Sequence, residues 1–194
     1  MLLVAGGALI VGRAVTRAVG RERWCGLEPA VGFATIMAVE GLLARIPGNR
    51  WGLILGLVAL AAFSAWALRR PSRADLPPAS LGLWVAIGVT VLALLVPFLI
   101  SARWGLLGMG YNNDLGLHLA WAEWLRSGFG TEPSDGYPLG PHGLSAALSF
   151  LPRLSLGPIF IGQLMAIVLL TVLTAWSAVD RLAGWRRPLA AVLI

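Results

Sequence analysis

Lysine is absent from this 194-residue sequence, cysteine occurs once, and charged side chains make up only 12% of the chain. That share is about half the charged fraction of a typical soluble domain. Together with 58% hydrophobic residues, it excludes intrinsic disorder, which requires low hydrophobicity and high charge. The single Cys25 excludes an intramolecular disulfide and a paired-cysteine metal or redox site. What remains is a chain dominated by long apolar stretches.

Apolar residues form five runs, and a sixth begins near the end of the sequence. The five cover approximately residues 1–12, 24–43, 51–68, 81–102 and 158–179. The fourth run has no charge in its 22 residues and is long enough to cross a bilayer. We therefore predict an all-α membrane protein, multi-pass in the cell membrane, with about five transmembrane helices plus the start of a sixth. Because the last run breaks off at Ile194, we expect the chain to be the N-terminal part of a longer protein and to be inactive alone.

Arginine supplies all 15 basic side chains, against nine acids, and the net charge is +6. In a soluble chain this excess would suggest nucleic-acid binding. Here the arginines cluster at the ends of apolar runs, as in cytoplasmic segments of membrane proteins, so no nucleic-acid partner is expected. Counting arginines by segment divides the chain into four hydrophobic helices at 1–102, an extracytoplasmic loop at 103–156, and the fifth transmembrane helix with the start of a sixth at 157–194.

The predicted extracytoplasmic loop concentrates polar chemistry, since it holds both histidines and four of the nine acids. Asp114 is a good residue to begin a helix, and the residues after it predict an amphipathic helix at 114–127. At 100° per residue, Asp114, His118 and Trp121 share one face of that helix. We expect the helix to lie parallel to the membrane surface, with Trp121 and Trp124 at headgroup level.

Two further features of the loop are predicted from local spacing. Glu123 and Arg126 point away from the face that bears Asp114, and their i,i+3 spacing allows an ion pair. A short helix of small residues is expected at 145–148. Pro141 lies near its first turn, where the missing N–H of proline is no loss.

The pattern Asn-Asp-x-x-x-His-x-x-x-Ala-Glu-x-Leu at 113–125, followed by Tyr-Pro-x-Gly-x-His at 137–142, resembles polytopic glycosyltransferases of the GT-C superfamily. The resemblance implies that a sugar moves from a polyprenyl-phosphate carrier to an extracytoplasmic acceptor, with membrane lipid and the carrier-linked sugar as partners. It also implies a catalytic carboxylate in the first large outer loop, at the position of Asp114. Two features depart from the family: the loop follows the fourth apolar run, and Asn112-Asn113-Asp114 lacks a second adjacent acid. The second departure argues against a metal held by two neighbouring acids.

The reaction that the resemblance implies needs only a few chemical groups. A carboxylate near the acceptor can remove its proton as general base, which is the role of Asp114. His118, one turn later, would share that proton, orient the acceptor or contact phosphate. A cation would stabilise the leaving phosphate, for which Arg103 and Arg126 are the candidates. The complete set of substrate-binding candidates is Arg103, Arg126, Tyr137 and His142.

Structural roles explain several of the same residues. Asp114 can be a helix cap and Asp135 a turn residue. His118 can be an interfacial histidine, and His142 a helix-start residue near the interface. The four side chains together could bind a divalent metal, the alternative cofactor, but only the i,i+4 pair has a ligand-like spacing. We therefore assign no metal ligand.

Two acids, Glu28 and Glu40, lie within the second apolar run, where an ionisable residue is costly and suggests a function. Glu28 can reach the arginine cluster before it, and Glu40 is about one turn from Arg45. A local ion pair explains Glu40 as well as a functional role does. Without such a pair, Glu40 would mark a proton or ion path, as in a transporter or channel component. A structural membrane subunit without chemistry is the third alternative.

Overall fold

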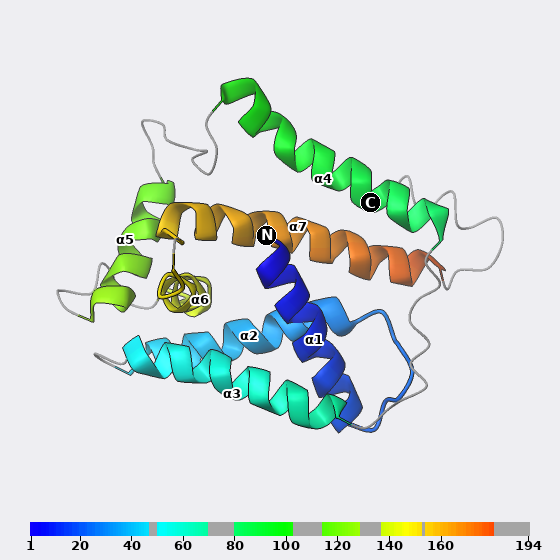
Figure 1. The fold of residues 1–194 in the computed structure, drawn as a ribbon, viewed down its shortest axis with the longest axis horizontal. Coiled ribbons are helices and arrows are strands. Elements are labelled where there is room, and N and C mark those ends of the chain that lie inside the picture. Colours follow the sequence, from blue (N-terminus) through cyan, green and yellow to red (C-terminus); the bar gives the residue numbers. More distant parts are fainter. Residues whose placement is uncertain (47–49, 70–79, 103–113, 129–136, 153, 181–194) are drawn as a thin grey trace.

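The computed structural model describes residues 1–194 except 47–49, 70–79, 103–113, 129–136, 153 and 181–194. Every regular element in the described part is a helix (Figure 1). The helices are α1 (Leu2–Ala18), α2 (Glu28–Ala44), α3 (Arg50–Leu68), α4 (Leu81–Ser101), α5 (Asp114–Ser127), α6 (Gly140–Leu148) and α7 (Leu156–Asp180). The all-α prediction is therefore confirmed.

Three of these helices, α3, α4 and α7, are long and apolar enough to cross a membrane, as expected for a membrane protein. The sequence predicted about five such helices. The difference lies in α1 and α2, which have 17 residues each, fewer than the about 20 that span the hydrocarbon core. In α2 the helix begins only at Glu28, because Gly26 adopts a positive φ of 78° and Pro29 occupies the first turn.

Several helix boundaries agree closely with the sequence. The predicted helix at 114–127 is α5, and the fourth apolar run is α4 to within one residue. The first helix is longer than predicted, because Arg13 and Arg17 continue α1 to Ala18 instead of ending it. Arginine is a good helix former, so a charged residue marks the end of an apolar run without ending the helix.

The long helices α2, α3, α4 and α7 run between two ends of the molecule, whereas α1 starts partway along α7 (Figure 1). The helices α1, α3 and α7 finish at one end, where α2 and α4 start. At the opposite end α2 and α4 finish, α3 and α7 start, and both short helices, α5 and α6, are found. The directions of α2, α3, α4 and α7 therefore alternate along the chain.

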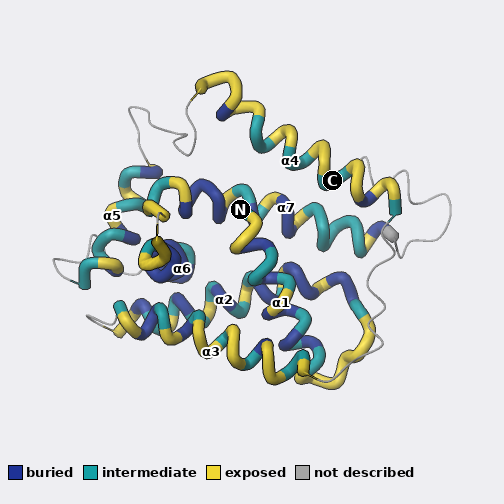
Figure 2. The backbone as a smooth tube through the Cα atoms, viewed as in Figure 1, coloured by how far each residue is buried: buried dark blue, intermediate teal, exposed yellow. Residues whose placement is uncertain are grey.

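Contrary to its expected place in an outer loop, α6 lies in the core of the protein. Eight of its nine residues are buried, and it contacts α2, α3, α5 and α7 (Figure 2). Small residues allow this, since a Cβ added at Gly140 would lie 2.5 Å from the carbonyl oxygen of Met37 in α2. On another face, the Ser145 hydroxyl donates to Oε1 of Gln163 in α7 at 3.2 Å, and both residues are buried.

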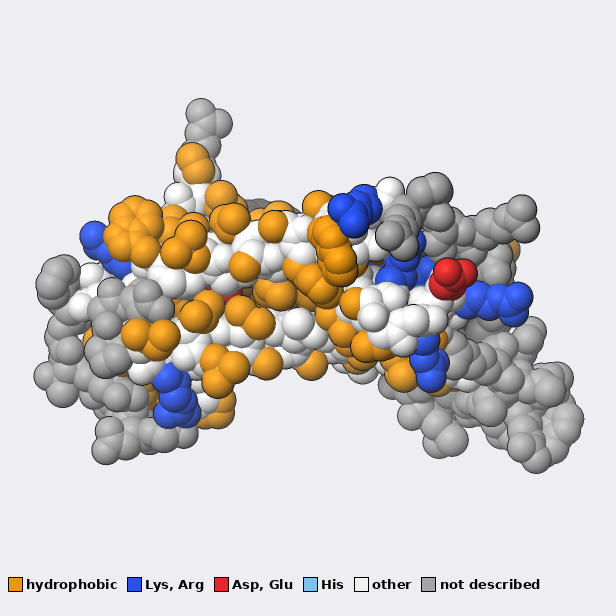
Figure 3. All heavy atoms as spheres, turned by 90° about the horizontal axis from the view of Figure 1, so that it is seen from below, with side chains coloured by type: hydrophobic (Ala, Val, Ile, Leu, Met, Phe, Trp, Pro, Cys, Tyr) orange, Lys and Arg blue, Asp and Glu red, His pale blue; other side chains and the backbone are white. Residues whose placement is uncertain are grey.

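On the face shown in Figure 3, apolar side chains lie between two ends that bear arginines. On α3, Trp51 and Trp66 are 60% and 56% exposed and stand near opposite ends of the helix. The guanidinium of Arg50 lies 5.4 Å from the Trp51 ring centroid, and that of Arg69 lies 5.6 Å from the Trp66 ring. Paired aromatic and cationic side chains at both ends of an apolar helix are typical of membrane interfaces.

Candidate functional site

The two histidines of the chain meet at the end of the bundle where α5 and α6 lie. They are 24 positions apart in the sequence, yet Nδ1 of His118 lies 3.0 Å from Nε2 of His142. This is a hydrogen-bonding distance, and the rings stack with centroids 5.2 Å apart. The sequence placed both residues among its candidates but did not predict that they contact each other.

His142 lies in the first turn of α6 and is buried, with 1% of its surface exposed. Its Nδ1 lies 3.1 Å from the carbonyl oxygen of Pro138, four residues earlier. Burial, followed by the proximity of His118, lowers the pKa of His142 to about 4. His142 does begin a helix, as expected, but its side chain faces the protein interior and not a membrane interface.

Aromatic rings enclose the histidine pair. Tyr137 stacks on Trp121 with centroids 5.5 Å apart, and its ring lies 5.8 Å from His118 and 5.4 Å from His142. From α7, Phe160 stacks on His118 at 5.2 Å and on His142 at 5.9 Å. Trp121 is completely buried, so its ring packs inside the protein and does not contact lipid headgroups. Sequence reasoning also missed Phe160, since nothing distinguishes it from its apolar neighbours.

A cavity of about 610 Å³ opens between α4, α5 and α7 beside this pair. Among the described residues, its titratable lining groups are Asp114, the first residue of α5, and His118, one turn later. The other walls are apolar: Ala93, Leu94, Pro97, Phe98, Leu115, Phe160, Ile161, Leu164, Met165 and Val168. The structure thus confirms that Asp114 and His118 face the same space, as their helical spacing predicts.

The remaining site candidates are placed differently. Arg126 lies near the far end of α5, where its Nε and Nη2 donate to the Glu123 carboxylate at 2.7 and 2.6 Å. This confirms the predicted i,i+3 ion pair and directs Arg126 away from the cavity. Arg103 and Asp135 lie outside the described residues. Within the described part of the chain, no three acidic, histidine or cysteine side chains form a group that could hold a metal ion.

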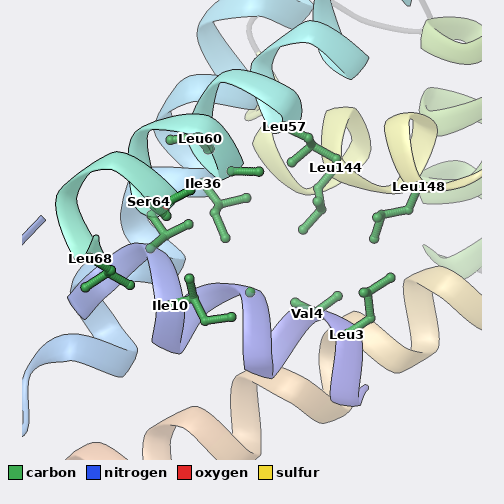
Figure 4. Close-up of a pocket in the computed structure, with 14 residues that line it drawn as sticks. Leu3, Val4, Ile10, Ile36, Leu57, Leu60, Ser64, Leu68, Leu144 and Leu148 are labelled. Carbon is green, nitrogen blue, oxygen red and sulfur yellow. The ribbon is translucent and has the colours of Figure 1, made fainter. Parts of the chain in front are cut away.

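A second cavity, of about 400 Å³, lies between α1, α3 and α6 (Figure 4). Aliphatic side chains such as Leu57, Leu60 and Leu144 point into it, and Ser64 is the single polar side chain among its described lining residues. This space has room for hydrocarbon but no group for acid–base chemistry. The cavity beside Asp114 and His118 is therefore the candidate functional site.

The two acids of α2 differ in their surroundings, although both are completely buried. Oε1 of Glu28 accepts from the backbone N–H of Cys25 at 2.8 Å and lies 3.6 Å from Nη1 of Arg13, as the arginine cluster predicted. Neither carboxyl oxygen of Glu40 has a hydrogen-bond partner among the described residues, and Arg45 is exposed. The local ion pair considered for Glu40 is thus not formed with any described residue.

Comparison with known proteins adds no assignment: no family model, no curated protein and no solved structure matches this chain.

Proposed function

We propose that the protein is an integral membrane glycosyltransferase of the GT-C type. In this proposal a sugar moves from a polyprenyl-phosphate carrier to an acceptor on the outer side of the cell membrane, where α5 and α6 lie. The observation that carries it is the cavity between α4 and α7, whose described lining residues are apolar except for Asp114 and His118. The carrier's hydrocarbon chain would pack between two membrane-spanning helices, and its phosphate and sugar would lie at α5.

The chemistry assigned to Asp114 follows from its position at the cavity. Its carboxylate takes the proton from the acceptor hydroxyl as the hydroxyl oxygen attacks the anomeric carbon. The bond between that carbon and the phosphate oxygen breaks, and the carrier phosphate leaves with the electron pair. His118 lies one turn along the same wall of the cavity and orients the acceptor. Of the two candidate cations, Arg103 remains the candidate for the phosphate, because Arg126 is bonded to Glu123.

Sugar transfer from a polyprenyl-phosphate donor, measured in membranes with the complete gene product, tests this role. Asp114→Asn keeps the size of the side chain but cannot accept a proton, and we expect a loss of about 100-fold or more. Glu123→Gln is the matched control, since it removes one negative charge from the same helix outside the cavity. It should leave transfer nearly unchanged.

Equal activity of wild type and Asp114→Asn, with both proteins inserted in the membrane, would reduce Asp114 to a helix-start residue. Equal losses in Asp114→Asn and Glu123→Gln would attribute the effect to the charge or stability of α5 and not to catalysis.

The second candidate function is a transporter or channel component, and Glu40 is the observation that favours it. A buried carboxyl group without a partner in the described structure is the kind of side chain that proton paths use. Proton uptake into vesicles, compared between wild type and Glu40→Gln, tests this alternative. Uptake that is lost in Glu40→Gln, together with no sugar transfer by wild type, would favour it over the glycosyltransferase.

A further inference from the structure

The hydrogen bonds around His142 determine which of its ring nitrogens carries a proton. The carbonyl oxygen of Pro138 can only accept, so Nδ1 of His142 is the donor across their 3.1 Å contact. Near neutral pH the His142 ring is uncharged, because burial lowers its pKa to about 4. An uncharged imidazole has a single N–H, which leaves Nε2 of His142 with a lone pair.

That lone pair in turn determines the protonation of His118. Nδ1 of His118 lies 3.0 Å from Nε2 of His142, and two lone pairs at this distance would repel each other. Nδ1 of His118 therefore carries a hydrogen and donates it. In uncharged His118, Nε2 is then the nitrogen with the lone pair, and it is the one basic nitrogen left in the pair.

The surroundings keep the pair in this arrangement. His118 lines the cavity that Asp114 also lines, whereas His142 does not. Phe160 stacks on both imidazole rings, and rotating the His118 ring by 180° would exchange its donating Nδ1 for a carbon. Packing and the hydrogen bond therefore favour the same ring orientation.

We propose that His142 is a positioning residue that holds His118 in the Nδ1–H tautomer, so that Nε2 of His118 acts as a hydrogen-bond acceptor at the site. This inference deepens the proposed function, on which its chemical meaning rests. A second hydroxyl of the acceptor donates its hydrogen bond to Nε2, and this contact orients the acceptor so that its attacking hydroxyl faces Asp114. The inference excludes the role in which uncharged His118 donates from Nε2 to a phosphate oxygen.

Nitrogen NMR on the ¹⁵N-histidine-labelled chain tests the tautomers directly. The 194-residue chain has two histidines, and protonated and lone-pair ring nitrogens resonate in widely separated ranges. At about pH 8 we expect both Nδ1 atoms to be protonated and both Nε2 atoms to carry lone pairs. A scalar coupling should join His118 Nδ1 to His142 Nε2. A protonated Nε2 in His118 would overturn the proposal.

Two substitutions separate positioning from a purely structural role. In His142→Gln the amide oxygen can still accept from Nδ1 of His118, whereas the ring of His142→Phe cannot. We expect His118 to keep its Nδ1–H signal in His142→Gln and to show the tautomer mixture of free histidine in His142→Phe. If His142→Gln and His142→Phe give the same His118 tautomer while both remain folded, the positioning role is refuted.

Sugar transfer supplies a second readout that depends on the proposed function. His142→Phe should lower kcat by about tenfold or more without a matching change in KM, and His142→Gln should retain most activity. If wild type shows the expected tautomers and coupling but transfers no sugar, the proposed function fails and the role of His142 toward His118 stands. If transfer occurs but His118 is protonated on Nε2, the role of His142 toward His118 fails and the proposed function stands.

Discussion

Gly12→Ala is expected to force α1 away from α2 and to destabilise the protein, whereas Gly7→Ala on the same helix is not. A Cβ added at Gly12 would lie 1.8 Å from the carbonyl oxygen of Glu28. On the facing helix, a Cβ at Gly32 would lie 1.7 Å from the carbonyl oxygen of Ala8. Real Cβ atoms keep at least 3.0 Å, so either substitution must separate the two backbones by more than 1 Å.

The expected magnitude follows from the size of that separation. A gap of about 0.5–1 Å already loses a quarter to a half of the van der Waals attraction between packed atoms. Overpacking substitutions cost about 1–3 kcal/mol, and we expect about 3 kcal/mol here because a backbone carbonyl cannot change rotamer. In a chain of this size that loss lowers Tm by about 6–12 °C. At Gly7 nothing lies within 4 Å of the added Cβ, so Gly7→Ala should be neutral or stabilise by up to about 1 kcal/mol.

The single cysteine provides the assay. Cys25 is 8% exposed, so a fluorogenic maleimide should react with it mainly when the bundle opens during a thermal ramp. We expect the thermal unfolding midpoint to fall in Gly12→Ala and in Gly32→Ala and to stay unchanged in Gly7→Ala. Equal thermal unfolding midpoints for Gly12→Ala and Gly7→Ala would show that α1 and α2 do not touch at Gly12. That result would refute the packing described here for the two helices.

The same Cys25 assay tests three further predictions. Arg13→Ala should lower the free energy of unfolding by about 3 kcal/mol, because it leaves the buried Glu28 without its cation, and Arg13→Lys should lower it less. Equal stability of wild type, Arg13→Ala and Arg13→Lys would contradict the ion pair. Glu40→Met should raise the free energy of unfolding by about 1–3 kcal/mol, because it replaces a buried carboxyl that has no described partner. A marked loss of stability would reveal a partner elsewhere in the chain. The folded pKa of His142 lies below its ordinary value, so its contribution to stability is complete above pH 6.5 and is lost as the pH falls toward 4. His142→Gln should flatten this part of the pH profile, and an unchanged profile would contradict the buried, uncharged ring.

Local patterns in the sequence were sufficient for much of the secondary structure. The start of α5 at Asp114 and its end near Ser127 follow from an acidic first turn and a glycine after the last one. The Glu123–Arg126 ion pair and the shared wall of Asp114 and His118 follow from helical spacing alone. These features depend on residues within a few positions of one another, which is why the sequence predicts them.

Features that join distant segments were not predictable in this way. The arginine count assigned the segment around α6 to an outer loop, but Gly140 and Gly143 instead allow α6 to pack against α2. That packing buries Trp121 and brings His142 to His118.

By itself, the sequence determined an all-helical chain with apolar helices, most of their boundaries, and a face of α5 that carries Asp114 and His118. Only the tertiary structure decided that α6 packs in the core, that Glu40 is buried without a described partner, and that the two histidines form a pair. The physical reason is the distance along the sequence over which each effect acts. Hydropathy and helical periodicity act over a few turns, whereas the neighbours of a buried side chain depend on which helices can approach closely enough to exclude water.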